Sequence, residues 1–238
     1  MNREYHHWYS PSLRRDMELL VFGHAGAPVL VFPTSLGRFF DFEDRGMVGA
    51  VADAVEEGRV QLYCIDGVDG ESWYNYGAPP RDRVVRHMEY ERYVREEAVP
   101  FIRSRAPAGR LTVTGCSFGG YHAVNLALRH PALVDAVLSM SGAFDIRQFV
   151  MGYHDEDCYF NNPVEYLPNL NDPWYLERFR SGLRIVLVAG ESDSCLDDNR
   201  RLSAMLHEKR IPHTLDVWGD GAQHDWPWWR HQIWKYLG

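Results

Sequence analysis

The sequence predicts an α/β fold with a mostly parallel central sheet, an antiparallel hairpin at the N-terminus and helices on both faces of the sheet. Short apolar runs, typical of strands that are covered on both faces, alternate along the chain with stretches of helical periodicity. The connections between these runs are long enough for parallel crossovers. With 238 residues and no linker-like tract, the chain is expected to form one domain over residues 1–238.

The predicted strands begin with a hairpin and continue as mostly apolar runs. A turn at Pro11 and Ser12 joins the first two strands, and the run at 184–189 is the most hydrophobic of the later ones. The predicted strands cover residues 4–10, 16–22, 29–32, 60–65, 111–116, 136–141, 184–189 and 213–218.

Helical periodicity appears between most of these strands. The predicted helices cover residues 42–57, 86–105, 121–130, 199–210 and 226–237. Pro100 is expected to kink or break the second helix near its end. Residues 145–182 show little periodicity and carry several aromatic residues beside three prolines. A stretch of this length inside a compact domain is typical of a lid or a pocket wall.

The segment at residues 115–119 fits GxSxG, in which a strained turn between a strand and a helix lifts a serine above a parallel sheet. Ser117 stands at its apex. Glycines two positions before and two positions after the serine allow the strand and the helix to approach closely. Ser117 is therefore a candidate nucleophile, and the backbone N–H of Phe118 is expected to face the reacting carbonyl.

A serine hydroxyl needs a base within hydrogen-bond reach and a third group that orients this base. With this type of turn, the chain order is serine, acid and histidine, each in a loop at the carboxyl end of a strand. Asp193 follows the seventh predicted strand and His224 the eighth, so they are the expected acid and base. Asp197 is the alternative acid, although it is placed as an N-terminal residue of the next helix. His213, at the start of a strand, is the alternative base.

Stabilising the oxyanion that forms during attack requires a second backbone donor. Its expected place is the loop after the third strand, where Ser35 or Leu36 would supply the amide. Some aromatic residues are candidates for the wall of an acyl or aryl pocket and equally for the core. They are Trp73, Tyr74, Tyr76 and Trp226.

Composition excludes several classes of partner. The net charge of −8 disfavours nucleic acids and anionic membranes, which need a concentrated basic face. The first residues lack the apolar core of a signal peptide, and no run approaches membrane-spanning length, so a cytoplasmic location is expected. The four cysteines lack CxxC spacing and are expected to be free thiols. No cofactor or metal is expected, and the cluster at 154–158 is interpreted as a solvated acidic loop.

These residues resemble the Putative esterase family of α/β-hydrolases, which includes S-formylglutathione hydrolases, feruloyl and acetylxylan esterases and the antigen 85 mycolyltransferases. The resemblance covers most of the chain. It lies in GCSFGG at 115–120, SGAFD at 141–145, AGESD at 189–193 and HDWPWW at 224–229. The last of these is the most specific, because in this family a tryptophan pair follows the histidine as the final helix begins.

The resemblance implies an α/β-hydrolase fold and a triad of Ser117, His224 and Asp193, with Leu36 as the second oxyanion donor and Ser35 as the alternative. The expected function is hydrolysis of a small-molecule ester or thioester through an acyl-enzyme. An acyltransferase with the same triad and a non-catalytic binding protein on this fold are the alternatives.

Overall fold

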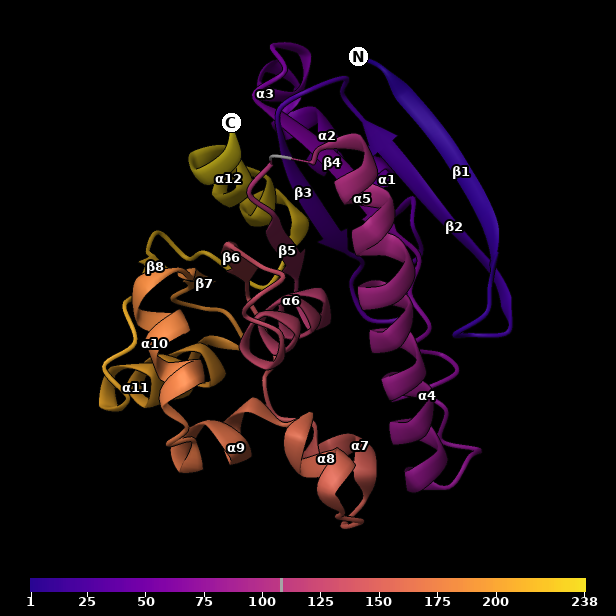
Figure 1. Cartoon of the computed structure of the whole chain (residues 1–238). Coiled ribbons are helices and arrows are strands. Elements are labelled where there is room, and N and C mark those ends of the chain that lie inside the picture. Colours follow the sequence, from indigo (N-terminus) through magenta and orange to yellow (C-terminus); the bar gives the residue numbers. More distant parts are fainter. Residues whose placement is uncertain (108) are drawn as a thin grey trace.

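The computed structural model describes residues 1–107 and 109–238. Within them the chain forms an eight-stranded sheet in the order β1-β2-β4-β3-β5-β6-β7-β8 (Figure 1). The strands are β1 (Arg3–Ser10), β2 (Arg15–Phe22), β3 (Ala27–Phe32), β4 (Val60–Ile65), β5 (Thr112–Cys116), β6 (Ala136–Met140), β7 (Arg184–Gly190) and β8 (His213–Trp218). β2 pairs antiparallel with β1 and β4, and the other neighbours pair in parallel. The predicted mostly parallel sheet with an N-terminal hairpin is confirmed.

Helices cover both faces of the sheet, as predicted. One face carries α1 (Asp41–Asp44), α2 (Met47–Ala50), α3 (Ala52–Glu56) and α12 (Trp226–Leu237). The other carries α4 (Pro80–Tyr93), α5 (Val99–Arg105), α6 (Phe118–Arg129) and α11 (Leu196–Glu208). Strand side chains alternate between the two cores: in β3, Val29 and Val31 join one core, whereas Leu30 and Phe32 join the other. This explains why the central strands are apolar on both faces.

The single helix expected over residues 42–57 is wrong. Three short helices, α1 to α3, take its place. Gly46 has a φ of 74°, in the left-handed region, and Val51 has a φ of −118° outside the helical region. Periodicity spans these two breaks, because the apolar side chains before and after them still face the same core.

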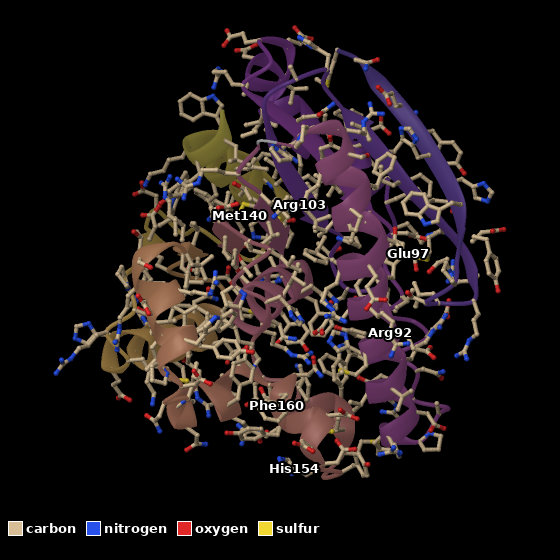
Figure 2. All side chains as sticks on the ribbon, viewed as in Figure 1. Arg92, Glu97, Arg103, Met140, His154 and Phe160 are labelled. Carbon is tan, nitrogen blue, oxygen red and sulfur yellow. The ribbon has the colours of Figure 1, made fainter. Side chains whose placement is uncertain are left out.

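The predicted helix at 86–105 begins earlier, at Pro80, and contains a wider turn. Between α4 and α5 lies a π-helical turn, η1 (Val94–Ala98), in which the N–H of Val99 bonds to the carbonyl of Val94. This irregularity precedes Pro100, which has no N–H to donate. Glu97 of η1 lies on the side of this helix that faces the β1–β2 hairpin (Figure 2). It accepts hydrogen bonds from Trp8 and Ser10, and so ties the helix to the hairpin.

Residues 145–182 fold into four short helices. These are α7 (Arg147–Val150), α8 (Glu156–Phe160), α9 (Pro163–Asn169) and α10 (Pro173–Ser181). None exceeds nine residues, which is too short to show clear periodicity. In the acidic cluster, Asp155 caps α8 by accepting the N–H of Cys158 at 2.8 Å.

In the C-terminal third, the observed helices lie close to the ones predicted from the sequence. α12 has the predicted bounds, and α11 begins at Leu196, three residues before the expected start. None of the described helices combines the length and the apolar character that a membrane crossing requires.

Candidate active site

Ser117 lies in a strained turn between β5 and α6. Its φ is 55° and its ψ is −121°, a conformation that side-chain-bearing residues rarely adopt. A Cβ on Gly115 would collide with the backbone of Gly119, and one on Gly119 would come within 2.5 Å of the Pro33 carbonyl oxygen. Because only hydrogen fits at both positions, the glycines allow β3, β5 and α6 to meet around the serine.

The structure brings Ser117, His224 and Asp193 together from three loops. His224 Nε2 lies 2.9 Å from Ser117 Oγ, and His224 Nδ1 lies 2.8 Å from Asp193 Oδ1. Each residue follows a parallel strand, β5, β7 or β8, and the carboxyl ends of these strands lie at one edge of the sheet. A carboxylate, an imidazole and a hydroxyl joined in this way can move a proton from the hydroxyl to the imidazole.

The surroundings of Asp193 and His224 favour an ionised carboxylate that faces a basic imidazole. Burial raises the pKa of Asp193, but hydrogen bonds from His224, Ser141 and the Cys195 amide outweigh it and leave the pKa below its ordinary value. Burial lowers the pKa of His224, but its hydrogen bond to Asp193 and its contact with the Cys195 thiol raise it to about 9. The imidazole is therefore a stronger base than a free histidine.

A second set of contacts holds Asp193 through Oδ2, the carboxylate oxygen that does not bond to His224. The Ser141 hydroxyl donates to Asp193 Oδ2 and accepts the indole N–H of Trp229 at 2.7 Å. The Trp229 ring also stands edge-on to His224, with the ring centroids 4.9 Å apart. Ser141 and Trp229 both lie in motifs singled out from the sequence, but the motifs did not predict their contacts with Asp193 and His224. One feature of the sequence pointed to Ser141: it directly follows β6, which lies next to β5 in the sheet.

The loop after β3 lies against the turn that carries Ser117. Thr34 is anchored by its N–H and its hydroxyl to Asp41 Oδ2, at 3.1 and 2.8 Å, and Ser35 Oγ accepts the Tyr74 hydroxyl at 2.8 Å. Leu36 has a φ of 59° and is more than half exposed. In the described part of the chain, no hydrogen bond occupies the amides of Ser35, Leu36 or Phe118.

The alternative acid and base lie elsewhere. Asp197 is in the first turn of α11 with its side chain 95% exposed, 3.4 Å from Arg200. His213 begins β8, at the end opposite to His224, and contacts Ile211 O and Ser203 Oγ, each at 2.8 Å.

The four aromatic residues named from the sequence have different environments. Trp73 is fully buried, and Trp226 packs on the α12 side of the sheet. Tyr74 lies beside Phe118, with centroids 5.7 Å apart, and Tyr76 is exposed. Phe149 of α7, which the sequence did not single out, contacts both Tyr74 and Phe118.

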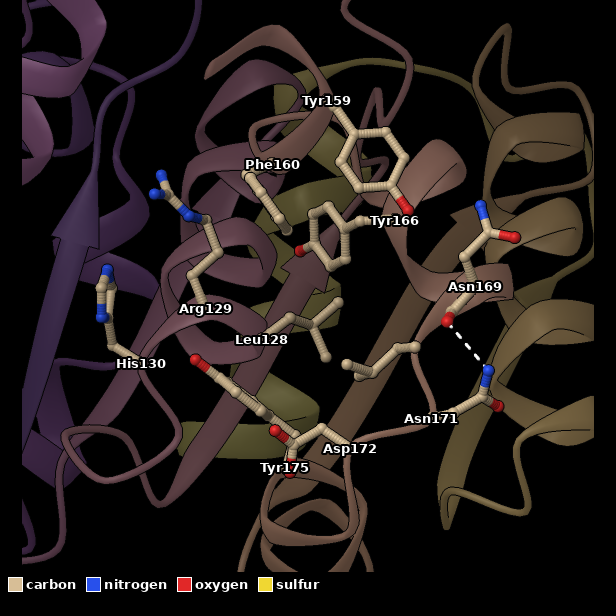
Figure 3. Close-up of a pocket in the computed structure, with 11 residues that line it drawn as sticks. Leu128, Arg129, His130, Tyr159, Phe160, Tyr166, Asn169, Asn171, Asp172 and Tyr175 are labelled. Atoms are coloured by element: carbon tan, nitrogen blue, oxygen red, sulfur yellow. Dashed lines mark hydrogen bonds between the residues drawn. The ribbon is translucent and has the colours of Figure 1, made fainter. Parts of the chain in front are cut away.

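A cavity of about 460 Å³ lies at the other end of α6 (Figure 3). Leu128 and Arg129 line it together with Tyr159, Tyr166 and Tyr175 from the segment 145–182. Twelve residues of helical rise separate Arg129 from Ser117, which is about 18 Å. This cavity is therefore distinct from the site at Ser117.

Solved structures share this fold. A ferulic acid esterase has a TM-score of 0.79 at 18% identity, over 99% of this chain and 95% of that chain. An S-formylglutathione hydrolase from Agrobacterium tumefaciens has a TM-score of 0.75 at 16% identity, over 99% of this chain and 92% of that chain. MPT51 of Mycobacterium tuberculosis has a TM-score of 0.69 at 15% identity, over 100% of this chain and 97% of that chain. No curated protein matches the chain.

The family model described as Putative esterase matches residues 10–238. This match includes the strand–turn–helix segment at 115–119 that carries Ser117, called the elbow below. It also includes the loops after β7 and β8 and the final helix, and it confirms the family inferred from the motifs. The chain therefore belongs to the Putative esterase family, and it has the α/β-hydrolase fold that it shares with these solved structures.

Proposed function

We propose that the protein hydrolyses a small-molecule carboxylic ester or thioester through an acyl-enzyme formed on Ser117. One observation carries the proposal: His224 lies 2.9 Å from Ser117 Oγ and 2.8 Å from Asp193 Oδ1, so nucleophile, base and orienting acid are in hydrogen-bond contact.

In the first half of the reaction, Ser117 Oγ attacks the carbonyl carbon while His224 Nε2 takes the hydroxyl proton. Asp193 holds the Nδ1–H tautomer and stabilises the imidazolium. The imidazolium then returns the proton to the leaving alcohol or thiol as its bond to the acyl carbon breaks. In the second half, water attacks the acyl-enzyme, His224 takes a proton from the water, and Ser117 leaves with that proton.

The N–H groups of Phe118 and Leu36 are proposed to hold the oxyanion, with the Ser35 amide as the alternative to Leu36. Support comes from the packing of the β3 loop against the elbow and from the three unoccupied amides. Losing one such donor typically costs about 3 kcal/mol of transition-state stabilisation.

We further propose that residues 1–238 are one domain in which the segment 145–182 supplies a pocket wall. Phe149 of this segment packs beside the residue that follows Ser117, with its ring centroid 5.1 Å from that of Phe118 and 4.9 Å from that of Tyr74. Tyr74, the partly exposed member of this cluster, would contact the acyl group, with the buried rings of Phe118 and Phe149 behind it.

A cytoplasmic location is part of the proposal. All four cysteines are free thiols in the structure, and unpaired cysteines fit a reducing compartment.

The test is hydrolysis of p-nitrophenyl esters of increasing acyl length by the protein, by Ser117→Ala and by the control Ser181→Ala, which changes an exposed serine on α10. Turnover should fall at least about a thousandfold in Ser117→Ala and stay unchanged in the control. A fluorophosphonate should label the protein and the control but not Ser117→Ala.

Two outcomes contradict the proposal. Absence of both turnover and fluorophosphonate labelling would favour a binding protein on this fold. If an added alcohol captured the acyl group faster than water at modest concentration, the protein would be an acyltransferase.

A further inference from the structure

Cys195 lies beside the proposed acid and base, and the mechanism does not use its thiol. Its backbone N–H donates to Asp193 Oδ1 at 2.8 Å. Its Sγ, a carboxylate oxygen of Asp193 and a ring nitrogen of His224 all lie within 4.8 Å of one another. Unlike the three other cysteines, which are buried, Cys195 is partly exposed.

These three side chains form a ligand set for a thiophilic divalent cation. A thiolate, an imidazole and a carboxylate are the donors that bind Zn²⁺, with metal–ligand bonds of about 2.0 to 2.3 Å. Bonds of this length place neighbouring donors about 3 to 4 Å apart, so small side-chain rotations bring the three atoms into range. Three protein ligands leave a fourth position for water, and the partial exposure of Cys195 provides access from solvent.

We propose that Asp193, Cys195 and His224 form an inhibitory site for Zn²⁺ or Cd²⁺. The bound cation replaces the proton of the Cys195 thiol, which is released to solvent. If His224 binds the cation through Nδ1, its hydrogen bond to Asp193 is lost and the ring proton moves to Nε2, which then has no lone pair to accept the Ser117 proton. If it binds through Nε2, the lone pair that would accept the Ser117 proton is occupied. In both cases the base is withdrawn from the serine.

The inhibitory part of this inference rests on the proposed function, whereas the binding part does not. Binding is therefore measured directly, with Co²⁺ as a spectroscopic substitute for Zn²⁺. A thiolate ligand should give an intense charge-transfer absorption in the near ultraviolet with the unaltered protein, Ser117→Ala and the control Cys158→Ala. The absorption should be absent in Cys195→Ser.

Inhibition is measured with a p-nitrophenyl ester, and each variant is compared with its own rate without metal. Zn²⁺ and Cd²⁺ should inhibit the protein and Cys158→Ala, a chelator should restore activity, and Mg²⁺, which prefers oxygen ligands, should have no effect. Cys195→Ser should raise the half-inhibitory Zn²⁺ concentration at least about tenfold.

Equal Zn²⁺ inhibition of the protein and Cys195→Ser would overturn the proposal, because the cation would then be acting at other residues. Absence of the charge-transfer absorption would overturn it as well. If that absorption depends on Cys195 but no ester is hydrolysed, the metal site stands and the proposed function fails.

Discussion

The Trp229 indole donates its N–H to Ser141 Oγ at 2.7 Å, and Ser141 passes the interaction on by donating its own proton to Asp193. The carboxylate is therefore held by Ser141 through Oδ2 and by the Cys195 amide through Oδ1, which also faces His224. Because Trp229, Ser141 and Asp193 are all buried, water cannot replace a hydrogen bond that is lost between them.

Trp229→Phe removes the indole N–H while keeping an aromatic ring beside His224. The free energy of unfolding should fall by about 1–2 kcal/mol, because the Ser141 oxygen loses its donor. The value of kcat/KM for ester hydrolysis should fall about tenfold, mainly through kcat, as Asp193 loses its fixed orientation. Urea unfolding and steady-state kinetics measure the two effects. Trp234→Phe, at an exposed position of the same helix, is the control, and equal kinetics in both variants would exclude a positioning role for Trp229.

Asp193→Asn keeps the size of the side chain but removes the charge that fixes the Nδ1–H tautomer of His224. In the proposed mechanism kcat should fall by about four orders of magnitude. Asp197→Asn should leave kcat within about twofold, because its side chain is solvated on α11. The opposite ranking of the two variants would make Asp197 the acid.

Activity should depend on pH through His224. Only the neutral imidazole accepts the Ser117 proton, and the pKa of His224 is raised to about 9, so kcat/KM should rise with pH and level off above about pH 9. Asp193→Asn removes the main hydrogen bond that raises this pKa and should shift the midpoint toward about 6.5. The residual activity of Asp193→Asn, followed from about pH 5 to pH 10, measures the shift. Identical midpoints in the two proteins would show that Asp193 does not set the basicity of His224.

Gly119→Ala tests the close approach around the elbow. The added Cβ would lie 2.5 Å from the Pro33 oxygen and 2.7 Å from the Phe32 oxygen, so β3 or α6 must shift. The free energy of unfolding should fall by about 1–3 kcal/mol, and ester hydrolysis should weaken because the β3 loop moves with the strand. Gly49→Ala, where the new Cβ meets no atom within 4 Å, should be neutral or stabilising by up to about 1 kcal/mol. If both variants unfold at the same denaturant concentration, the packing argument for Gly119 is wrong.

The sequence predicts the sheet well because its signals are local. Each central strand is an apolar run that faces a core on both sides, and Gly115 must be small because a Cβ there would meet the backbone of Gly119, four residues along the chain. Parallel pairing from β5 to β8 puts the loops of Ser117, Asp193 and His224 at the same end of the sheet, and the structure places the three side chains in contact.

Features that depend on distant contacts could not be predicted in this way. The break at Gly46 lies within a pattern that is apolar on both sides of it, so periodicity indicated one helix. The bonds of Ser141 to Asp193 and Trp229 span 52 and 88 positions. The thiol of Cys195 meets His224 only because β7 and β8 are neighbours in the sheet.

The bond between His224 and Ser117 joins positions 107 residues apart, and it forms only when β8 has been added to the edge of the sheet beyond β6 and β7. A partly folded chain with a complete elbow but an undocked C-terminal third would carry a strained serine without its base. Reaction of Ser117 with a fluorophosphonate would therefore count only molecules in which β8 has joined the sheet. The appearance of that label during refolding would time this step of sheet assembly.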